Sequence, residues 1–433
     1  MQNQSIGSVS VPHPNALRRN TAVVAGLLAI SYLSQDARAL DWPRWRGPDL
    51  NGISRETGWS TTWPASGPKQ LWKANVGVGF SSIAVSQGRA YLMGNRNKQQ
   101  DVVYCLDAVS GKEVWKFAYD APLEPNNYEG GPSATPTVDG NRVYTLSKQG
   151  LLLCLDAATG KLVWSNSVPE AVGAFLAASP AGGGKPSAEL KAAKPEWGFA
   201  GSVLIVGDRL YVNVGKNGTA LDKSGKVVWA TGPEPAGYST FVPYSMDRRQ
   251  GLALFAMRAV VGVDPASGKE LWSYPWKTRY DVNAADPILH GDLVFVSSGY
   301  DRGATVIRIT GAQAQKVWEN RKMRNHFNSC VLIDGFLYGF DESDLRCLDF
   351  KTGEERWTDE GLGKGALMAA DGKLIVLSEK GELVVAPATA AGFKPVARAK
   401  VLGGKCWTTP VLANGRIYCR NAAGDTVCVD VSK

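Results

Sequence analysis

The stretch CLDAATGKLVW, residues 154–164, decides the fold because near copies of it recur along the chain. CLDAVSGKEVW ends at Trp115, LDKSGKVVW at Trp229, VDPASGKELW at Trp272 and CLDFKTGEERW at Trp357. A spacing of about 40–50 residues between copies is typical of a β-propeller, in which each repeat forms one blade. The tryptophans that mark the repeats are Trp72, Trp115, Trp164, Trp229, Trp272, Trp318 and Trp357.

Each repeat contains three further strand-like runs before its tryptophan strand. In the second repeat these are ATPTV, RVYTL and LLLCLD, followed by KLVW, with Asp-Gly, Lys-Gln-Gly and Ala-Thr-Gly turns between them. Short runs of β-branched and aromatic residues bounded by such turn residues indicate antiparallel strands. We therefore predict four-stranded antiparallel blades.

The repeated motif has a physical explanation. Its aspartate closes a strand and accepts hydrogen bonds from the next backbone N–H groups, and its glycine supplies the positive φ that completes the turn. The strand that follows then carries the tryptophan off the sheet, where its large ring can dock on the neighbouring blade. The seven marker tryptophans are therefore predicted to hold the blades together.

Eight outer hairpins follow one another between residues 82 and 420, which predicts eight blades. The last repeat ends without a tryptophan strand, whereas residues 71–76 (LWKANV) have no strands before them. We expect this N-terminal strand to complete the last blade and close the ring, because closure removes both sheet edges. An open solenoid is the alternative. The predicted all-β propeller spans residues 70–433, with a loop insertion at residues 170–196.

A tryptophan-rich strap, residues 40–69, is expected to precede the propeller. It carries Trp42, Trp45, Trp59 and Trp63 within a segment that has no strand pattern. We expect these rings to pack against the propeller. Stacking of a sugar on them is the alternative interpretation.

Residues 1–39 are typical of a cleaved export signal. Arg18 and Arg19 precede an apolar run at residues 21–33, and an Ala-Arg-Ala site follows at residues 37–39. A short buried helix is the alternative, which the basic flank disfavours. Since no apolar run reaches about 18 residues, no transmembrane span is expected. The predicted location is the periplasm or the outside of the cell.

The composition limits the classes of function. Hydrophobic residues make up 44% and charged residues 20% of the 433 residues, which is typical of a folded chain with a core. The net charge of +8 is spread without a basic run, so nucleic acid is not an expected partner. Among the seven cysteines, those at the repeat position Cys105, Cys154, Cys347 and Cys428 are expected to be buried apolar residues. Cys419 and Cys428 are a candidate disulfide.

A second set of residues is expected at the propeller axis. The innermost strand of each blade begins near the axis, so the residues just before it line one mouth of the central channel. A carboxylate pair, two lysines, amides and aromatic rings make this mouth a predicted ligand-binding site, and a water-filled polar channel is the alternative. The selected residues are Glu129, Tyr238, Asp281, Asn283, His326, Asn328, Lys364, Lys405 and Trp407.

His326 is the only histidine of the chain at a plausible site. An acid–base role is one interpretation because a histidine pKa lies near neutrality. A hydrolase or lyase would use Glu129, Asp281 and His326 together. The other interpretation is a structural histidine held by hydrogen bonds. No metal-ligand spacing of histidines or cysteines occurs in the sequence, so no metal site is predicted.

The repeats in LDAVSGKEVW and LDAATGKLVW resemble the A-x-D-x-x-T-G-x-x-x-W docking motif of the eight-bladed quinoprotein-like propellers, over residues 70–433. DWPRWRGPDLNGIS, residues 41–54, is similar to the opening of secreted bacterial PQQ-like repeat proteins. The resemblance implies the propeller fold. It also implies two unlike functions, a pyrroloquinoline-quinone dehydrogenase with calcium, or a non-catalytic scaffold such as the lipoprotein of the outer-membrane barrel-assembly machinery.

Departures from both patterns shape the predicted function. The dehydrogenases carry adjacent cysteines against the quinone, and this chain has no Cys-Cys pair. The scaffold lipoprotein begins at a lipidated cysteine, which is absent near residue 39. We therefore predict an exported, non-catalytic binding or scaffolding module with no cofactor, whose partners are other envelope or secreted proteins or a small axial ligand. A quinone-dependent alcohol or sugar dehydrogenase is the alternative.

Overall fold

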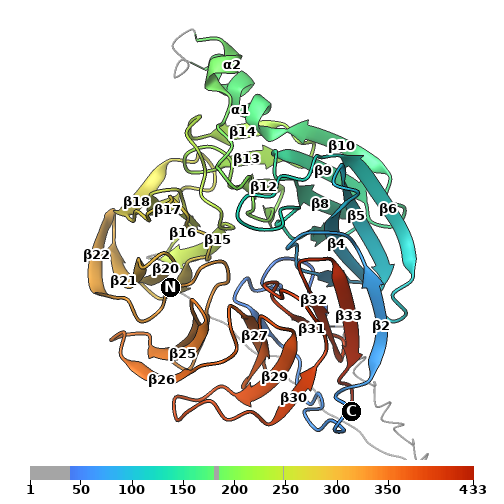
Figure 1. Ribbon diagram of the computed structural model, residues 1–433. Coiled ribbons are helices and arrows are strands. Elements are labelled where there is room, and N and C mark those ends of the chain that lie inside the picture. Colours follow the sequence, from blue (N-terminus) through green and yellow to red (C-terminus); the bar gives the residue numbers. More distant parts are fainter. Residues whose placement is uncertain (1–39, 180–184, 247) are drawn as a thin grey trace, which may run out of the picture. The chain divides into compact units, whose positions relative to one another are not determined.

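The computed structural model describes residues 40–179, 185–246 and 248–433. In these residues eight antiparallel sheets of four strands follow one another as the blades of a β-propeller, which confirms the predicted fold (Figure 1). The predicted export signal, residues 1–39, lies outside the described residues. Within the described ranges, no helix has the length and apolar character needed to cross a membrane.

Within blades one to seven the four strands pair in chain order, from the axis outwards. Blades one to four consist of β3–β6 (Ala84–Ser86, Arg89–Arg96, Gln100–Asp107, Glu113–Asp120), β7–β10 (Thr137–Asp139, Arg142–Leu146, Leu151–Asp156, Leu162–Ser167), β11–β14 (Leu204–Val206, Arg209–Val212, Thr219–Asp222, Val227–Ala230) and β15–β18 (Val242–Met246, Arg249–Phe255, Ala259–Val263, Glu270–Pro275). Blades five to seven consist of β19–β22 (Ile288–His290, Leu293–Ser298, Gly303–Thr310, Gln313–Asn320), β23–β26 (Val331–Ile333, Phe336–Asp341, Asp344–Asp349, Glu355–Asp359) and β27–β30 (Ala366–Ala370, Lys373–Leu377, Glu382–Pro387, Ala397–Lys400).

The N-terminal strand closes the ring, as predicted. Blade eight consists of β31–β33 (Val411–Ala413, Arg416–Arg420, Asp425–Asp430) and of β2 (Gln70–Asn75), which pairs antiparallel with β33 (Figure 1). The blade therefore takes its outermost strand from the beginning of the propeller and its other three from the end. This pairing covers the outer edge of β33, which an open array would leave free.

The marker tryptophans lie between neighbouring blades. The indole N–H of Trp115 in blade one donates to the carbonyl of Ala157 in blade two at 2.9 Å. Trp272 of blade four differs, because its indole donates to the Tyr244 hydroxyl of its own blade at 2.7 Å. The turn of the next blade that would receive this ring, between β21 and β22, is shorter than in the other blades. The other indoles donate to the next blade as Trp115 does: Trp72 to Ala108, Trp164 to Lys223, Trp229 to Pro265, Trp318 to Phe350 and Trp357 to Thr389.

The turn of the repeated motif is shaped to receive this ring. Asp156 accepts hydrogen bonds from the backbone N–H of Ala158 and from the N–H and hydroxyl of Thr159, at 2.8–3.1 Å. Gly160 has a φ of +71°, and a Cβ at this position would stand 2.5 Å from the ring of Trp115. Glycine is therefore required twice here, once by the backbone conformation and once by the neighbouring indole.

Among its described residues, the insertion for which the sequence predicts a loop forms two helices. Helix α1 (Val168–Ala177) follows β10 directly and has Pro169 in its first turn, and the short α2 comprises Ser187–Leu190. Val172 and Leu176 of α1 are buried against a core cluster shared with blades two and three. Because these apolar residues recur on one helix face, the segment gains more from packing than an irregular loop would.

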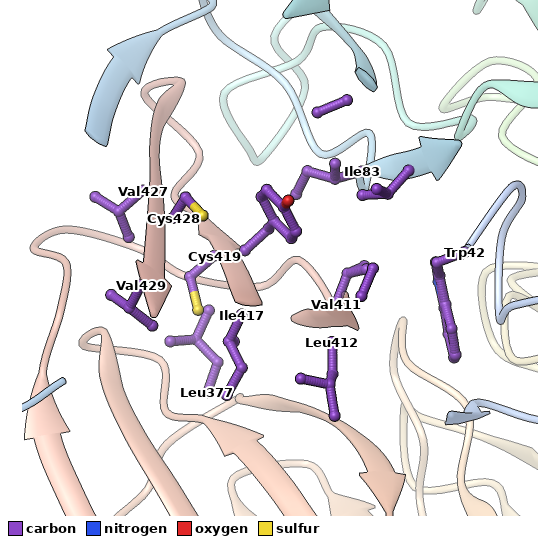
Figure 2. Packing of buried hydrophobic residues seen from close by; sticks show 14 of the residues in the cluster. Trp42, Ile83, Leu377, Val411, Leu412, Ile417, Cys419, Val427, Cys428 and Val429 are labelled. Carbon is purple, nitrogen blue, oxygen red and sulfur yellow. The ribbon is translucent and has the colours of Figure 1, made fainter. Parts of the chain in front are cut away.

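One hydrophobic cluster joins blades seven, eight and one and includes Trp42 and Trp59 of the strap; Figure 2 shows part of it. All seven cysteines lie in the described ranges and are free, buried thiols. The candidate disulfide is therefore not formed. Cys428 pairs in register with Tyr418, whereas Cys419 pairs with Val427, so the two thiols lie on opposite faces of the sheet. In Figure 2 Cys419 points towards Leu377.

The strap runs along the innermost strands of several blades. Trp42 pairs with Val85 of β3, and the carbonyl of Pro43 accepts from the N–H of Val138 in β7. Further along, the two-residue strand β1 (Ile53–Ser54) adds a parallel fifth strand to blade seven. The strap thus lies across one end of the propeller axis, at the hairpins between first and second strands.

Candidate ligand-binding cavity at the propeller axis

A cavity of about 610 Å³ lies at the axis. The segments that precede the innermost strands all reach it, so every blade contributes to its wall. One lining residue from each blade, in order from blade one to blade eight, is Phe80, Ser133, Ser202, Tyr238, Asp286, His326, Lys364 and Trp407. A volume of this size is typical of sites for small organic ligands.

Aromatic rings follow one another around much of the cavity wall and are called the aromatic belt below. His326 stacks on Phe327 with 4.0 Å between ring centroids, and Phe327 lies 4.6 Å from Trp407. On the other side, His326 meets the edge of Tyr300 at 4.5 Å. The belt consists of Tyr280, Tyr300, His326, Phe327, Trp407, Phe80 and Tyr128, whose successive centroids are 4.0–5.9 Å apart.

The belt continues opposite His326 through Trp197 and Tyr238, which are 6.2 Å apart. Trp197 follows the helical insertion, and its indole donates to the carbonyl of Asn126 at 3.3 Å. Burial raises the pKa of Tyr238 to about 12, so its hydroxyl stays protonated near neutral pH. The insertion therefore supplies one aromatic face to the cavity.

Two charged side chains, Lys364 and Glu342, contact the imidazole of His326. Lys364 Nζ lies 2.8 Å from His326 Nδ1 and 3.0 Å from Glu342 Oε2. Nδ1 of His326 thus lies between this ammonium group and the Glu342 carboxylate, whose Oε2 is 3.2 Å away. Nε2 is buried and has no hydrogen-bond partner among the described residues.

Glu342 stays ionised within this cluster. Burial by itself raises the pKa of Glu342, but the hydrogen bonds and the positive charge of its neighbours outweigh burial and lower the pKa to about 2. Glu379 plays a similar part on the next blade, because it accepts from the indole of Trp407 at 2.9 Å and from the N–H of Lys364 at 3.3 Å. The two carboxylates thus fix the positions of Lys364 and Trp407 in the cavity wall.

The strap closes one end of the cavity. Trp45 lines the cavity and donates its indole N–H to Asp286 at 2.6 Å. Asp286 also accepts from the N–H of Thr240 at 2.7 Å, and Arg46 lies 3.8 Å away. Burial raises the pKa of Asp286, although Arg46 and these donors act in the opposite direction. The floor is therefore a buried and internally paired polar group.

The structure brings five of the nine residues selected from the sequence into one cavity wall. They are Tyr238, His326, Asn328, Lys364 and Trp407. The amide of Asn328 is itself committed, because it donates to the carbonyls of Gly365 and Trp407 at 3.1 Å. Glu129 and Lys405 pair with each other at 2.8 Å outside the lining, and Lys405 lies over the Trp407 ring at 4.2 Å.

The other two selected residues have different surroundings. Asp281 forms an exposed ion pair with Arg258, with 2.6 Å between Oδ2 and the guanidinium. Asn283 is fully buried and donates to the carbonyls of Ala256 and Met257 at 3.0 Å, while it accepts from the Ser298 hydroxyl. Neither side chain lines the cavity. The side chain of Asn283 is buried against the backbone of blade four instead.

The residues that the sequence analysis did not select come from other segments. Tyr300 and Glu342 lie in hairpins between the second and third strands of blades five and six, and Trp45 belongs to the strap. None of the three lies in a segment just before an innermost strand, which is where the sequence analysis looked for site residues. A signal was present for two other lining residues, because Glu196 and Trp197 stand at the end of the insertion, in the segment before the innermost strand of blade three.

The residues at the axis do not fit calcium with pyrroloquinoline quinone. Calcium needs several oxygen ligands that converge. Here Asp286 binds Trp45 and Thr240, and Glu342 binds Lys364, which leaves Glu196 as a single lining carboxylate without a cationic partner among the described residues. In the described ranges, no three His, Cys, Asp or Glu side chains gather closely enough to hold a metal ion.

A family model described as outer membrane protein assembly factor BamB matches residues 56–131 and 99–359, which together span more than half of the chain. The chain belongs to this family. No curated protein matches it in sequence. The BamB family thus accounts for the repeats of blades one to six and for the end of the strap.

Solved structures share the architecture at low identity. BamB from Moraxella catarrhalis has a TM-score of 0.57 at 15% identity, covering 84% of this chain and 99% of its own. Quinohemoprotein alcohol dehydrogenase from Comamonas testosteroni has a TM-score of 0.60 at 14% identity, covering 92% and 82%. The computationally designed Ika8 protein has a TM-score of 0.56 at 10% identity, covering 86% and 100%. Such identities show a common fold, and an enzyme, an assembly factor and a designed protein share it.

Proposed function

We propose that the protein is a non-catalytic binding propeller that acts outside the cytoplasm and holds a small ligand in its axial cavity. The cavity itself carries the proposal, because it combines an aromatic belt, a few polar groups and a closed end. Largely apolar, concave sites with a few placed polar groups are typical of ligand binding. The basic flank, the apolar run and the Ala-Arg-Ala site within residues 1–39 support export.

The contacts of the titratable residues support a binding role over catalysis. A hydrolase or lyase would need Glu129, Asp281 and His326 to converge on one reacting atom. Glu129 instead pairs with Lys405 and Asp281 with Arg258. His326 contacts a third set of groups, Lys364 and Glu342. The three side chains therefore serve three separate local networks.

Calorimetric titration with pyrroloquinoline quinone, with and without calcium, tests the non-catalytic part of the proposal. The chain without residues 1–39 would be titrated and then mixed with primary alcohols and a dye acceptor. We expect no calcium-dependent quinone binding and no dye reduction. Saturable quinone binding followed by alcohol-dependent dye reduction would overturn the proposal and establish a dehydrogenase.

Thermal-shift screening with small solutes tests the cavity. The proposal expects at least one solute to stabilise the wild type by binding, and expects Trp407→Leu to weaken that stabilisation. If instead every solute fails and the protein binds another envelope protein through its loops, the axial site is not the functional site and the protein is a scaffold.

A further inference from the structure

We infer that the ligand of the axial cavity is a neutral oligosaccharide, which enters by one of its ends. This inference rests on the proposed function and names the class of ligand for that site. Three observations carry it: the aromatic belt, the neutral polar groups between its rings, and the pairing of the charges around it.

The belt lines the cavity with several aromatic rings whose positions are fixed by their neighbours. Tyr300, Phe327 and Trp407 are held at fixed tilts by neighbouring rings, with interplanar angles of 31° between Phe327 and Trp407 and 72° between Tyr300 and His326. The C–H groups on the face of a pyranose ring are weakly positive, and they pack on the negative face of an aromatic ring. Phe327 is stacked between His326 and Trp407, so sugar units would pack on the other rings of the belt.

Neutral hydrogen-bonding groups lie between the rings. They are Asn126, Asn127, Ser133, Thr240, Thr408 and Thr409, all of which line the cavity. A purely apolar ligand would bury these amides and hydroxyls without partners, which costs free energy. A polyhydroxylated ligand both donates and accepts, so it can satisfy them without carrying a charge.

The charges at the wall disfavour an ionic ligand. Among the described residues, Lys364 is the only lysine or arginine that lines the cavity, and its ammonium is committed to Glu342 and His326. Asp286 and Glu196 also line the cavity. Asp286 is paired within the floor, whereas Glu196, which accepts from the Asn126 amide at 3.4 Å and has no cationic partner among the described residues, would repel an anionic ligand. A cationic ligand would face Lys364, with Arg46 3.8 Å behind Asp286. A neutral ligand avoids both repulsions.

The geometry of the two ends indicates how the ligand enters. Trp45 and Asp286 close the floor, and Tyr280, which is 45% exposed, marks the open rim of the belt. A chain cannot thread through such a cavity. The terminal sugar units of an oligosaccharide therefore enter, while the rest extends into solvent past Tyr280.

Isothermal titration calorimetry with defined probes tests the inference. The neutral probes are cellotriose, maltotriose and N,N′,N″-triacetylchitotriose. The matched charged probes are trigalacturonate as an anion, choline as a cation and pyrroloquinoline quinone as an aromatic anion. We expect at least one neutral trisaccharide to bind saturably, and more tightly than each charged probe.

Paired variants identify the binding face. Trp407→Leu keeps an apolar side chain but removes the ring face, and we expect it to weaken trisaccharide binding about tenfold or more. Trp407→Phe keeps a ring face and should stay within about threefold of the wild type. Tyr300→Leu is a second test, because Tyr300 lines the cavity and the change leaves the Trp407–Glu379 hydrogen bond in place. Trp63→Leu is the matched control, because Trp63 belongs to the strap and does not line the cavity.

The outcomes separate the inference from the proposed function. Binding of only a charged probe, with loss in Trp407→Leu, would overturn the oligosaccharide inference and leave the axial site in place. Equal binding by Trp407→Phe and Trp407→Leu would overturn the role of the ring faces. Failure of all six probes would contradict the inference and the axial binding site together.

Discussion

Glu342 shows how a single residue sets the electrostatics of the cavity wall. It lies in the hairpin between β24 and β25, and it accepts from Lys364 while His326 Nδ1 lies 3.2 Å away. Because this cluster keeps a partly buried carboxylate ionised, the lysine that faces the cavity is neutralised by a neighbour and need not be neutralised by a ligand. Residue-scale pairing of this kind is what leaves the cavity suited to an uncharged molecule.

This pairing predicts a pH dependence of stability. The pKa of Glu342 is lowered from its usual 4.5 to about 2 in the folded chain. Its stabilising contribution is therefore complete above the unfolded pKa and is lost as the pH falls towards the folded value. In urea denaturation, the difference in unfolding free energy between the wild type and Glu342→Gln should narrow between pH 6 and pH 2.5. Parallel pH profiles of the two proteins would contradict the pairing.

Asn283 and Asp281, which the sequence placed at the axial mouth, differ in burial and therefore in their expected contribution to stability. Asn283 is buried and bridges several backbone carbonyls, whereas Asp281 forms an ion pair with the exposed Arg258. Asn283→Ala should lower the unfolding free energy by about 2 kcal/mol, because buried carbonyls lose their donor. Asp281→Asn should change it by less than about 1 kcal/mol, as is usual for surface pairs. Equal effects in chemical denaturation would show that Asn283 is not a structural residue.

At the scale of the element, the tryptophan strand and the turn before it form one unit. The ring of Trp115 is 7% exposed and rests against Gly160, while the equivalent ring of Trp164 is only partly buried. Trp318 and Trp357 are likewise only partly buried, so the repeats bury their tryptophan rings to different extents. Identical motifs therefore make unequal contributions.

Trp115→Ala should destabilise the protein by about 3–5 kcal/mol, which is the usual range for removal of a buried tryptophan. Trp164→Ala should cost clearly less, because part of that ring already contacts solvent. Both variants keep the turn intact, so the comparison isolates the buried ring. A smaller loss for Trp115→Ala than for Trp164→Ala, measured by denaturant unfolding, would contradict the docking argument.

The elements could be predicted from the sequence because they depend on local patterns. The D-x-x-[ST]-G turn, the alternating strands and the tryptophan strand are each encoded within one repeat. Ring closure could also be predicted, because the last repeat lacks a tryptophan strand and the N-terminal strand has none before it. The cavity depends on contacts between segments far apart in the chain. Sequence position placed Asn283 beside Asp281 at the mouth, yet hydrogen bonds to Ala256 and Met257 turn it into the core. Trp45 and Glu342 reach the site from the strap and from an outer hairpin, which no repeat pattern reveals.

At the scale of the whole molecule, the ring depends on the junction between blades eight and one. Arg420 of β32 is fully buried there. Its guanidinium donates to the carbonyls of Ser81 and Met93 at 2.7 and 2.6 Å, and to that of Gly77 at 3.0 Å. Since these carbonyls belong to blade one and the segment leading into it, one side chain from the end of the chain fastens the beginning of the propeller.

Arg420→Met should therefore weaken closure as a whole. The variant leaves three buried carbonyls without a donor, and we expect a loss of about 3 kcal/mol or more in unfolding free energy. Arg398→Met is the control, because Arg398 forms an exposed ion pair with Glu382 and should change the value by less than about 1 kcal/mol. Hydrogen exchange should also rise in β2 and β33, which meet at the closure, before it rises in blades three to five. Uniform exchange across the blades, with equal stability of both variants, would show that pairing of β2 with β33 closes the ring without Arg420.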